Sequence, residues 1–243
     1  MHHSYLKKFA AWSVHVFTVS GIFLGFLALL STVNYNFTQA VFFLALALFV
    51  DGIDGTIARY VGVENITPTI DGSILDNIID YFNYVLVPTF MIHWFGFVGE
   101  NYSLLVCFLI LTVSSYTFAN KGIKTDDYYF SGFPALWNLV VLYFYLLETS
   151  ELINIGIVIV LSVFTFIPIK YVHPIRVLEF RKTNIAMTAL WCVTTVYLLL
   201  MKETLDKSQL IPLDFSIYSV WIFINLYFLF ITLRRSFKKP SVS

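Results

Sequence analysis

The sequence predicts an all-α, polytopic integral membrane protein with about eight transmembrane helices. Its composition is the first reason, because 58% of the 243 residues are hydrophobic and 12% are charged, whereas a soluble domain is about half apolar and a quarter charged. The second reason is that apolar stretches of the length needed to cross a bilayer, about 20 residues, recur along the chain. The third is an uneven distribution of Lys and Arg among the segments between these stretches.

The predicted spans follow one another without a polar stretch that would form a separate soluble domain. The first span comes after Lys7 and Lys8 and is too long for the core of a signal peptide. The fifth is the shortest and consists of the segment FPALWNLVVLYFYLL. The eight spans cover residues 11–33, 38–59, 74–97, 102–119, 133–147, 152–170, 184–201 and 214–233.

The basic residues predict which ends of these spans face the cytoplasm. In the eight-span arrangement, Lys202 and Lys207 lie on one side and the other thirteen of the 15 basic residues lie on the side of the N-terminus. Cytoplasmic segments are the ones enriched in Lys and Arg, so we expect both termini to be cytoplasmic. The thirteen are Lys7, Lys8, Arg59, Lys121, Lys124, Lys170, Arg176, Arg181, Lys182, Arg234, Arg235, Lys238 and Lys239.

Two neighbouring spans carry aspartates in a helical spacing. Asp51 and Asp54 follow an apolar run and are three residues apart, while Asp76 and Asp80 are four apart on the next span. Residues at these spacings are neighbours on a helix surface. If the two spans pack antiparallel, we expect the four carboxylates to face one small volume.

Such a cluster is costly unless cations neutralise it. Each aspartate within a membrane helix costs about 2.5–3.5 kcal/mol, and crowded carboxylates repel one another. Oxygen ligands favour hard divalent cations such as Mg²⁺ or Mn²⁺, and two such ions suit phosphoryl transfer. The sequence therefore predicts metal ligands at Asp51, Asp54, Asp76 and Asp80.

Small and basic residues frame these acids. Gly55, Ala58 and Gly72 would let a bulky ligand approach the helix backbones, and Arg59 is suited to pair with a phosphate. Asp71, just ahead of the third span, is expected to cap that helix.

The acids and their frame form the pattern D-x₂-D-G-x₂-A-R-x₁₂-G-x₃-D-x₃-D, read from DGIDGTIAR and GSILDNIID. This pattern resembles the signature of the CDP-alcohol phosphatidyltransferase family. The twelve-residue gap is longer than in most members and resembles the bacterial branch that makes phosphatidylcholine, which has eight spans rather than six. The segments KTDDYYFSGFPALWN and KYVHPIRV resemble the same branch.

The resemblance implies a function and a domain organisation. CDP-diacylglycerol would donate its phosphatidyl group to choline and release CMP, with Mn²⁺ or Mg²⁺, two ions, as cofactor. It implies that Asp80 is the general base and that Gly55, Ala58, Arg59 and Gly72 line the nucleotide site. It further implies a bacterial inner-membrane enzyme with a cytoplasmic active site among membrane lipids, a homodimer, and one membrane domain over 1–243. That domain would consist of a six-span core (1–183) and two additional spans (184–243).

The acceptor and the protein class leave alternatives open. Aromatic faces recognise quaternary ammonium groups best, but ordinary packing would equally explain each aromatic residue near the acids. Asp126 and Asp127 would supply a counter-charge or simply solvate a loop. Serine or inositol is the alternative acceptor, and a cation or proton transporter is the alternative class; the zero net charge gives no reason to expect a nucleic-acid partner. The aromatic candidates are Tyr81, Tyr84, Tyr128, Tyr129, Phe130 and Trp137.

Overall fold

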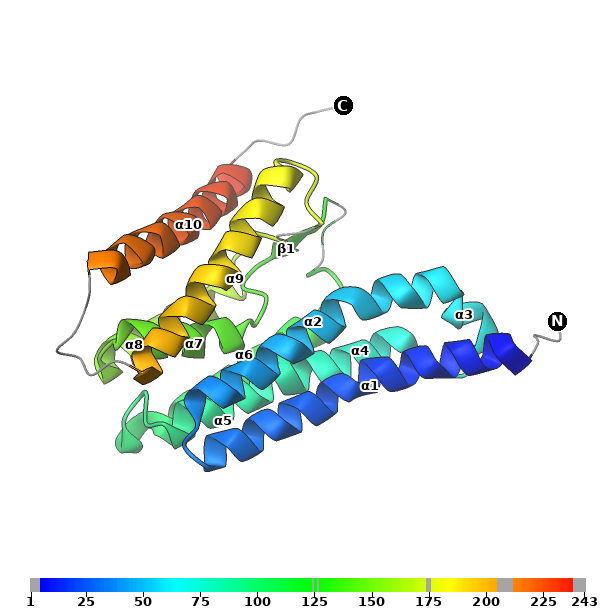
Figure 1. Ribbon diagram of the computed structural model, residues 1–243, viewed down its shortest axis with the longest axis horizontal. Coiled ribbons are helices and arrows are strands. Elements are labelled where there is room, and N and C mark those ends of the chain that lie inside the picture. The colour runs from blue at the N-terminus through cyan, green and yellow to red at the C-terminus, as the bar shows by residue number, and fades with distance from the viewer. Residues whose placement is uncertain (1–4, 124, 126, 174–175, 205–211, 238–243) are drawn as a thin grey trace.

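The computed structural model describes residues 5–123, 125, 127–173, 176–204 and 212–237. Figure 1 shows an assembly of helices, to which a two-stranded antiparallel sheet is added. Lys124, Asp126, Lys207, Lys238 and Lys239, which the sequence analysis named, lie outside the described residues. The elements are α1 (Tyr5–Val33), α2 (Phe37–Val61), α3 (Val63–Ile66), α4 (Gly72–Asp80), the π-helix η1 (Tyr81–Leu86), α5 (Val87–Trp94), α6 (Glu100–Ala119), β1 (Tyr129–Ser131), α7 (Trp137–Leu147), α8 (Glu151–Phe164), β2 (Lys170–Val172), α9 (Arg181–Thr204) and α10 (Pro212–Phe237).

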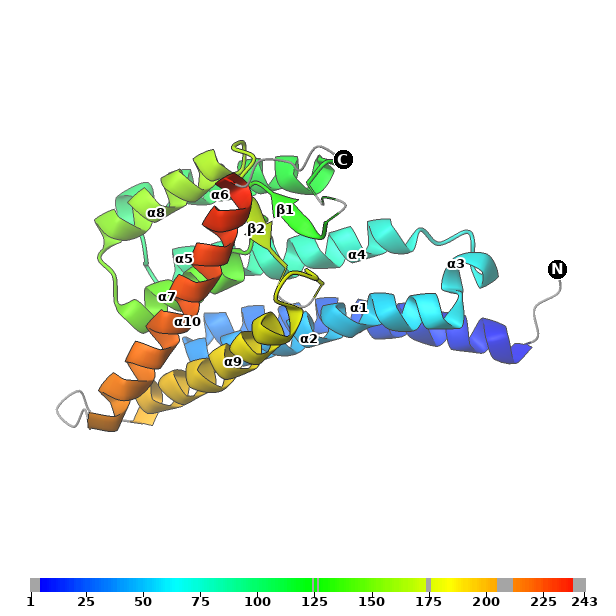
Figure 2. The ribbon, with the colours of Figure 1, turned by 90° about the horizontal axis from the view of Figure 1, so that it is seen from above.

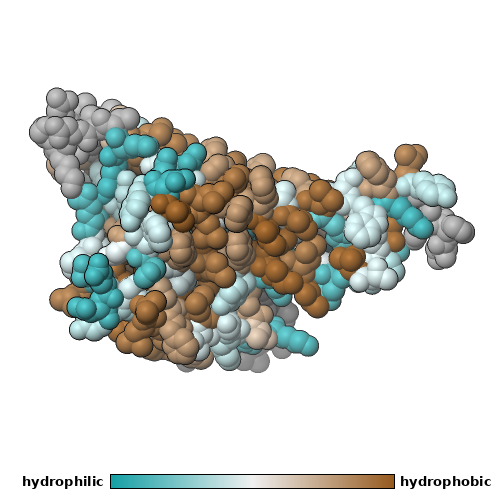
Figure 3. Space-filling view, turned by 90° about the horizontal axis from the view of Figure 1, so that it is seen from below, coloured by the Kyte–Doolittle hydropathy of each residue, from teal (hydrophilic) through white to brown (hydrophobic). Residues whose placement is uncertain are grey.

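The prediction of an all-α membrane protein is confirmed. Within the described residues, α1, α2, α6, α9 and α10 are long and apolar enough to cross a membrane. The elements α4, η1 and α5 follow one another without a break and coincide with the third predicted span. In Figure 3, apolar residues gather across the middle of the molecule and polar residues lie nearer its two ends. With 11 residues, α7 rises about 17 Å, less than the roughly 30 Å of a hydrocarbon core.

The fifth and sixth predicted spans extend four or more residues beyond the helices that the structure contains. The fifth predicted span begins at 133, but α7 begins at Trp137, because Pro134 is followed by Ala135 with a φ of 57° and helical dihedrals are excluded there. The sixth predicted span ends at 170, but α8 ends at Phe164. Lys170 instead starts β2, which pairs antiparallel with β1.

The first half of the chain forms a helical unit in which α1 packs along α2 and against the α4–η1 run (Figure 1). On α1, Gly21 and Gly25 lie where this helix faces η1. Small residues at such positions let helix backbones approach closely in a membrane. The Asn83 side chain of η1 fills the space and donates a 3.1 Å hydrogen bond to the Gly21 carbonyl. The position of η1 is therefore fixed by a polar contact to α1.

Helix α7 lies at the centre of the hydrophobic core. Trp137, at its N-terminus, is 0% exposed, and its indole N–H donates to Ser114 Oγ of α6 at 2.8 Å. At the other end of α7, the Tyr145 ring stacks on Phe37 of α2 with 3.8 Å between the ring centroids. Burial of such aromatic side chains contributes most to a core of this kind, so α7 connects the first helical unit to α6.

The two-stranded β1–β2 sheet is joined to the end of α10 by a cluster of charged and polar side chains, here called the C-terminal clamp (Asp127, Lys170, Arg235 and Ser236). The Asp127 carboxylate pairs with Lys170 Nζ at 2.9 Å and with the Arg235 guanidinium. The Lys170 backbone N–H donates to Ser236 Oγ at 2.8 Å. Burial alone would raise the pKa of Asp127, but hydrogen bonds from Thr125, Arg235 and Lys170 hold that pKa well below its usual range.

Candidate active site

Three of the four predicted acidic ligands come together between α2 and α4. One carboxylate oxygen from each of Asp51, Asp76 and Asp80 lies within 4.8 Å of the others, and all three side chains are half-buried. The chain reverses direction through α3, so α4 runs back along α2 (Figure 2). Asp76 and Asp80 are one turn apart on α4, which directs both toward the Asp51 side of α2.

Asp54 lies outside this group. It is 5% exposed and faces Thr18 of α1, with the positive charge of Arg176 near enough to act on it. A three-residue step on an α-helix is about 60° short of a full turn, which is enough to aim Asp54 toward α1 instead of toward Asp76. Its role as a metal ligand stays a prediction.

A tyrosine completes the acid cluster. The Tyr84 hydroxyl, on η1, donates a hydrogen bond of 2.6 Å to Asp51 Oδ2. In the sequence, Tyr84 is one of the six aromatic candidates near the acids and carries no further signal by composition alone. Its position four residues after Asp80 is the helical spacing that could have identified it as a neighbour of the cluster.

The residues predicted to line a nucleotide site have different surroundings. The Arg59 side chain is exposed, and its Nη2 donates to Thr56 Oγ1 at 3.3 Å. Its Nη1 lies 3.4 Å from the place that a Cβ on Gly55 would take, whereas a Cβ on Gly72 would meet nothing within 4 Å. Ala58 packs with the small apolar cluster between α1 and α3. Open space therefore remains beside Gly72, at the start of α4.

Asp71 has the capping role that the sequence predicted. Its carboxylate accepts hydrogen bonds from the backbone N–H groups of Ser73 at 2.9 Å and Ile74 at 3.1 Å. These donors have no partner inside the helix, so Asp71 fixes the start of α4 and with it the position of Asp76.

The other candidate aromatic residues have different surroundings. The Tyr81 hydroxyl donates to the Leu111 carbonyl of α6 at 3.1 Å, and Trp137 is buried in the core. The Tyr129 ring makes cation–π contacts with Lys170 and Arg235. The Phe130 ring stacks on His173 and Tyr128 is exposed, whereas Tyr84 is hydrogen-bonded to Asp51 of the acid cluster.

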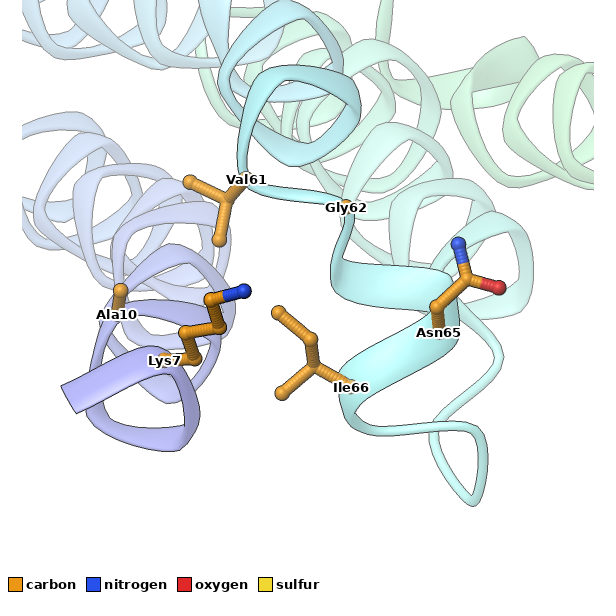
Figure 4. A pocket seen from close by; sticks show the side chains of 6 residues that line it. All are labelled: Lys7, Ala10, Val61, Gly62, Asn65 and Ile66. Carbon is orange, nitrogen blue, oxygen red and sulfur yellow. The ribbon is translucent and has the colours of Figure 1, made fainter. Parts of the chain in front are cut away.

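A separate cavity of about 270 Å³ lies at the N-terminal end of α1, against the turn between α2 and α3. Figure 4 shows Lys7 and Ile66 on opposite sides of it. None of the clustered acids lines this cavity; its lining residues are Lys7, Ala10, Val61, Gly62, Asn65 and Ile66. The candidate active site is therefore the acid cluster and not this cavity.

Comparison with known proteins identifies the family. Residues 13–168 match the CDP-alcohol phosphatidyltransferase family, and the whole acidic motif from Asp51 to Asp80 lies inside the match. The chain belongs to this family. It is therefore a membrane-bound phosphatidyltransferase, and the acid cluster lies within the residues that match the family.

Three curated relatives show how far the similarity to family members extends. A phosphatidylcholine synthase of Mesorhizobium japonicum is 45% identical over 182 residues, which is 75% of this chain and 68% of that protein. One of Agrobacterium fabrum is 43% identical over 191 residues, 79% of each chain. One of Pseudomonas aeruginosa is 39% identical over 231 residues, 95% of this chain and 94% of that protein.

The acid cluster fits the divalent metal that the family generally uses. Mg²⁺ binds oxygen at about 2.0–2.1 Å, so ligands on opposite sides of such an ion are about 4 Å apart. The oxygens of Asp51, Asp76 and Asp80 lie within 4.8 Å of one another, so small rotations of these side chains would enclose an ion. All the donors are oxygens, which favours Mg²⁺ or Mn²⁺ over softer metals.

Proposed function

We propose that this chain transfers the phosphatidyl group of CDP-diacylglycerol to choline and releases CMP. The observation that carries this proposal is the three-carboxylate cluster of Asp51, Asp76 and Asp80, built by the motif of a phosphatidyltransferase family. The choice of choline rests on relatives named phosphatidylcholine synthase, one of which is similar across 95% of the chain.

Each part of the motif has a distinct task in this reaction. Asp51, Asp54, Asp76 and Asp80 would hold Mn²⁺ or Mg²⁺, which when bound offsets the negative charge of the phosphates. Arg59 is exposed beside the motif and pairs with a phosphate of the nucleotide. The open space at Gly72 gives the nucleotide access to the backbone at the start of α4.

Asp80 is the proposed general base. The choline oxygen attacks the phosphorus that carries diacylglycerol, the bond from that phosphorus to CMP breaks, and Asp80 accepts the hydroxyl proton of choline. Asp80 suits this task because it lies one helical turn further from the start of α4 than Asp76, away from Arg59 and the nucleotide. An in-line displacement requires this separation, since the attacking and leaving oxygens lie on opposite sides of the phosphorus.

We place the enzyme in the bacterial inner membrane with eight spans, both termini and the active site on the cytoplasmic side. The basic residues support this orientation, and five long apolar helices support five of the eight spans. The six-span core of 1–183 is consistent with a family match that ends at residue 168, before α9 begins. The homodimer is a proposal by analogy with the family, to be checked by cross-linking in native membranes.

The decisive experiment measures CMP release from CDP-diacylglycerol by the purified enzyme in detergent or liposomes. We expect release with choline, loss of release in EDTA, and recovery when Mn²⁺ or Mg²⁺ is added back. Turnover with serine or inositol but not choline would show that the acceptor is wrong. Full activity of the chelated enzyme would show that the metal assignment is wrong, and the absence of CMP release with every alcohol would refute the transferase.

A further inference from the structure

The third span contains a π-helical segment at the point where the acid cluster ends. Helix α4 ends at Asp80, and η1 runs from Tyr81 to Leu86 before α5 continues the span. π-Helices make up well under 1% of residues in globular proteins and occur frequently at functional sites. The π-helical segment therefore directly follows the last acid of the cluster in the chain.

The wider turn bears on which side chain lies above Asp80. In an α-helix, with 3.6 residues per turn, the fourth residue along is offset by about 40°. A π-helix forms i→i+5 hydrogen bonds, so its wider turn reduces this offset and keeps Tyr84 on the acidic face. Tyr84 is 7% exposed, and its hydroxyl reaches Asp51 on the facing helix.

The backbone around Tyr84 is held from two sides. Asn83 donates to the Gly21 carbonyl of α1 at 3.1 Å, and Tyr81 donates to the Leu111 carbonyl of α6 at 3.1 Å. The Tyr84 ring therefore has a fixed position from which its hydroxyl meets Asp51 Oδ2 at 2.6 Å. This distance is that of a charge-assisted O–H···O⁻ bond, about twice as strong as a neutral one.

We propose that Tyr84 is a positioning residue that fixes the orientation of the Asp51 carboxylate toward Asp76 and Asp80. Ligating carboxylates are commonly hydrogen-bonded by a partner behind them, and loss of such a partner typically costs about 10–100-fold in metal affinity or activity. The tyrosine preorganises one ligand from α2 to match the two ligands from α4. This inference rests on the proposed metal site and assigns the π-helical turn a part in it.

The test compares Tyr84→Phe with Tyr143→Phe. Each substitution keeps the ring and removes one hydroxyl that donates a 2.6 Å hydrogen bond, to Asp51 in the first case and to Asn225 of α10 in the second. Binding of Mn²⁺ to the purified, substrate-free protein is followed by electron paramagnetic resonance of the free ion, and thermal unfolding is measured without metal. We expect about 10–100-fold weaker Mn²⁺ binding for Tyr84→Phe and unchanged Mn²⁺ binding for Tyr143→Phe.

Turnover in the same preparations separates the remaining roles. At saturating Mn²⁺ we expect Tyr84→Phe to recover most of its kcat with an unchanged KM for choline. Wild-type Mn²⁺ affinity in Tyr84→Phe would overturn the proposal, as would an equal loss in both variants, which would indicate general loosening. A raised KM for choline with normal Mn²⁺ binding would instead make Tyr84 a substrate contact. The Mn²⁺ measurement needs no substrate, so a wrong acceptor would leave its result intact.

Discussion

The contact between α1 and η1 at Gly25 gives the sharpest prediction about the architecture that supports the acid cluster. A Cβ on Gly25 would lie 2.1 Å from Asn83 Oδ1 and 2.7 Å from a ring carbon of Phe82. Ordinary contacts of a Cβ atom are 3.4–4 Å, so in Gly25→Ala either Asn83 must leave its place or α1 must move away. Both routes break the hydrogen bond from Asn83 to the Gly21 carbonyl.

The free energy of unfolding should fall by about 2 kcal/mol. Overpacking of this kind costs about 1–3 kcal/mol, and loss of the hydrogen bond adds about 1 kcal/mol. The higher helix propensity of alanine offsets about 0.5–1 kcal/mol of this loss. For a chain of this size, 2 kcal/mol corresponds to a fall in Tm of roughly 4–8 °C.

Thermal unfolding in detergent, followed by circular dichroism, measures this fall. Gly156→Ala in α8 is the matched control, because a Cβ there would meet nothing within 4 Å and only the propensity gain should remain. We also expect reduced CMP release for Gly25→Ala, since the displaced η1 carries Tyr84. A Tm at or above that of the wild type would refute the reasoning about the α1–η1 contact.

The remaining predictions concern the acids and the orientation in the membrane. Asp80→Asn should lower kcat about 10²–10⁴-fold with donor and Mn²⁺ affinities near normal, whereas Asp76→Asn should weaken both affinities; equal loss in the two would make Asp80 chiefly a ligand. Asp127→Asn should lower the free energy of unfolding by roughly 1–2 kcal/mol. Because the folded pKa of Asp127 is depressed, its contribution is present above the unfolded pKa of about 3.9 and is lost as pH falls through the folded pKa. The Tm deficit of Asp127→Asn should therefore be equal at pH 5 and pH 8, and its disappearance by pH 5 would contradict the ion cluster. An impermeant thiol reagent added outside intact cells should fail to label Ser241→Cys, and labelling there would exclude eight spans with a cytoplasmic C-terminus.

Hydropathy predicted most helix positions because membrane helices must be both apolar and long. The predicted span 38–59 is close to α2, Phe37–Val61, and 102–119 is close to α6, Glu100–Ala119. The π-helical turn could not be predicted, since the residues YFNYVL are equally compatible with an α-helix. The two-stranded β1–β2 sheet depends on pairing between Tyr129 and Val172, a contact between segments separated by two helices.

Helical spacing predicted the acid cluster in part. Asp76 and Asp80 are one helical turn apart and therefore lie on nearly the same face of α4, and both carboxylates lie close to that of Asp51. Asp54 is three residues from Asp51. The helix that Asp54 faces depends on where α1 packs, and the spacing of residues on α2 does not determine that packing. The hydrogen bond from Tyr84 to Asp51 could not be predicted either. It depends on how η1 and α2 are oriented toward each other and on the π-helical turn.

The C-terminal clamp bears on the order in which the nascent chain can assemble. Asp127 and Arg235 are 108 residues apart in sequence, so their ion pair forms only after α10 has left the ribosome and entered the bilayer. Until then, the β1–β2 sheet lacks both Arg235 and the Ser236 hydroxyl that accepts from the Lys170 backbone. Contacts of such long range form late in folding, so cotranslational insertion would leave the sheet unsecured until its final stage. A chain truncated within α10 would consequently insert its earlier helices and still leave the sheet without its contacts to α10.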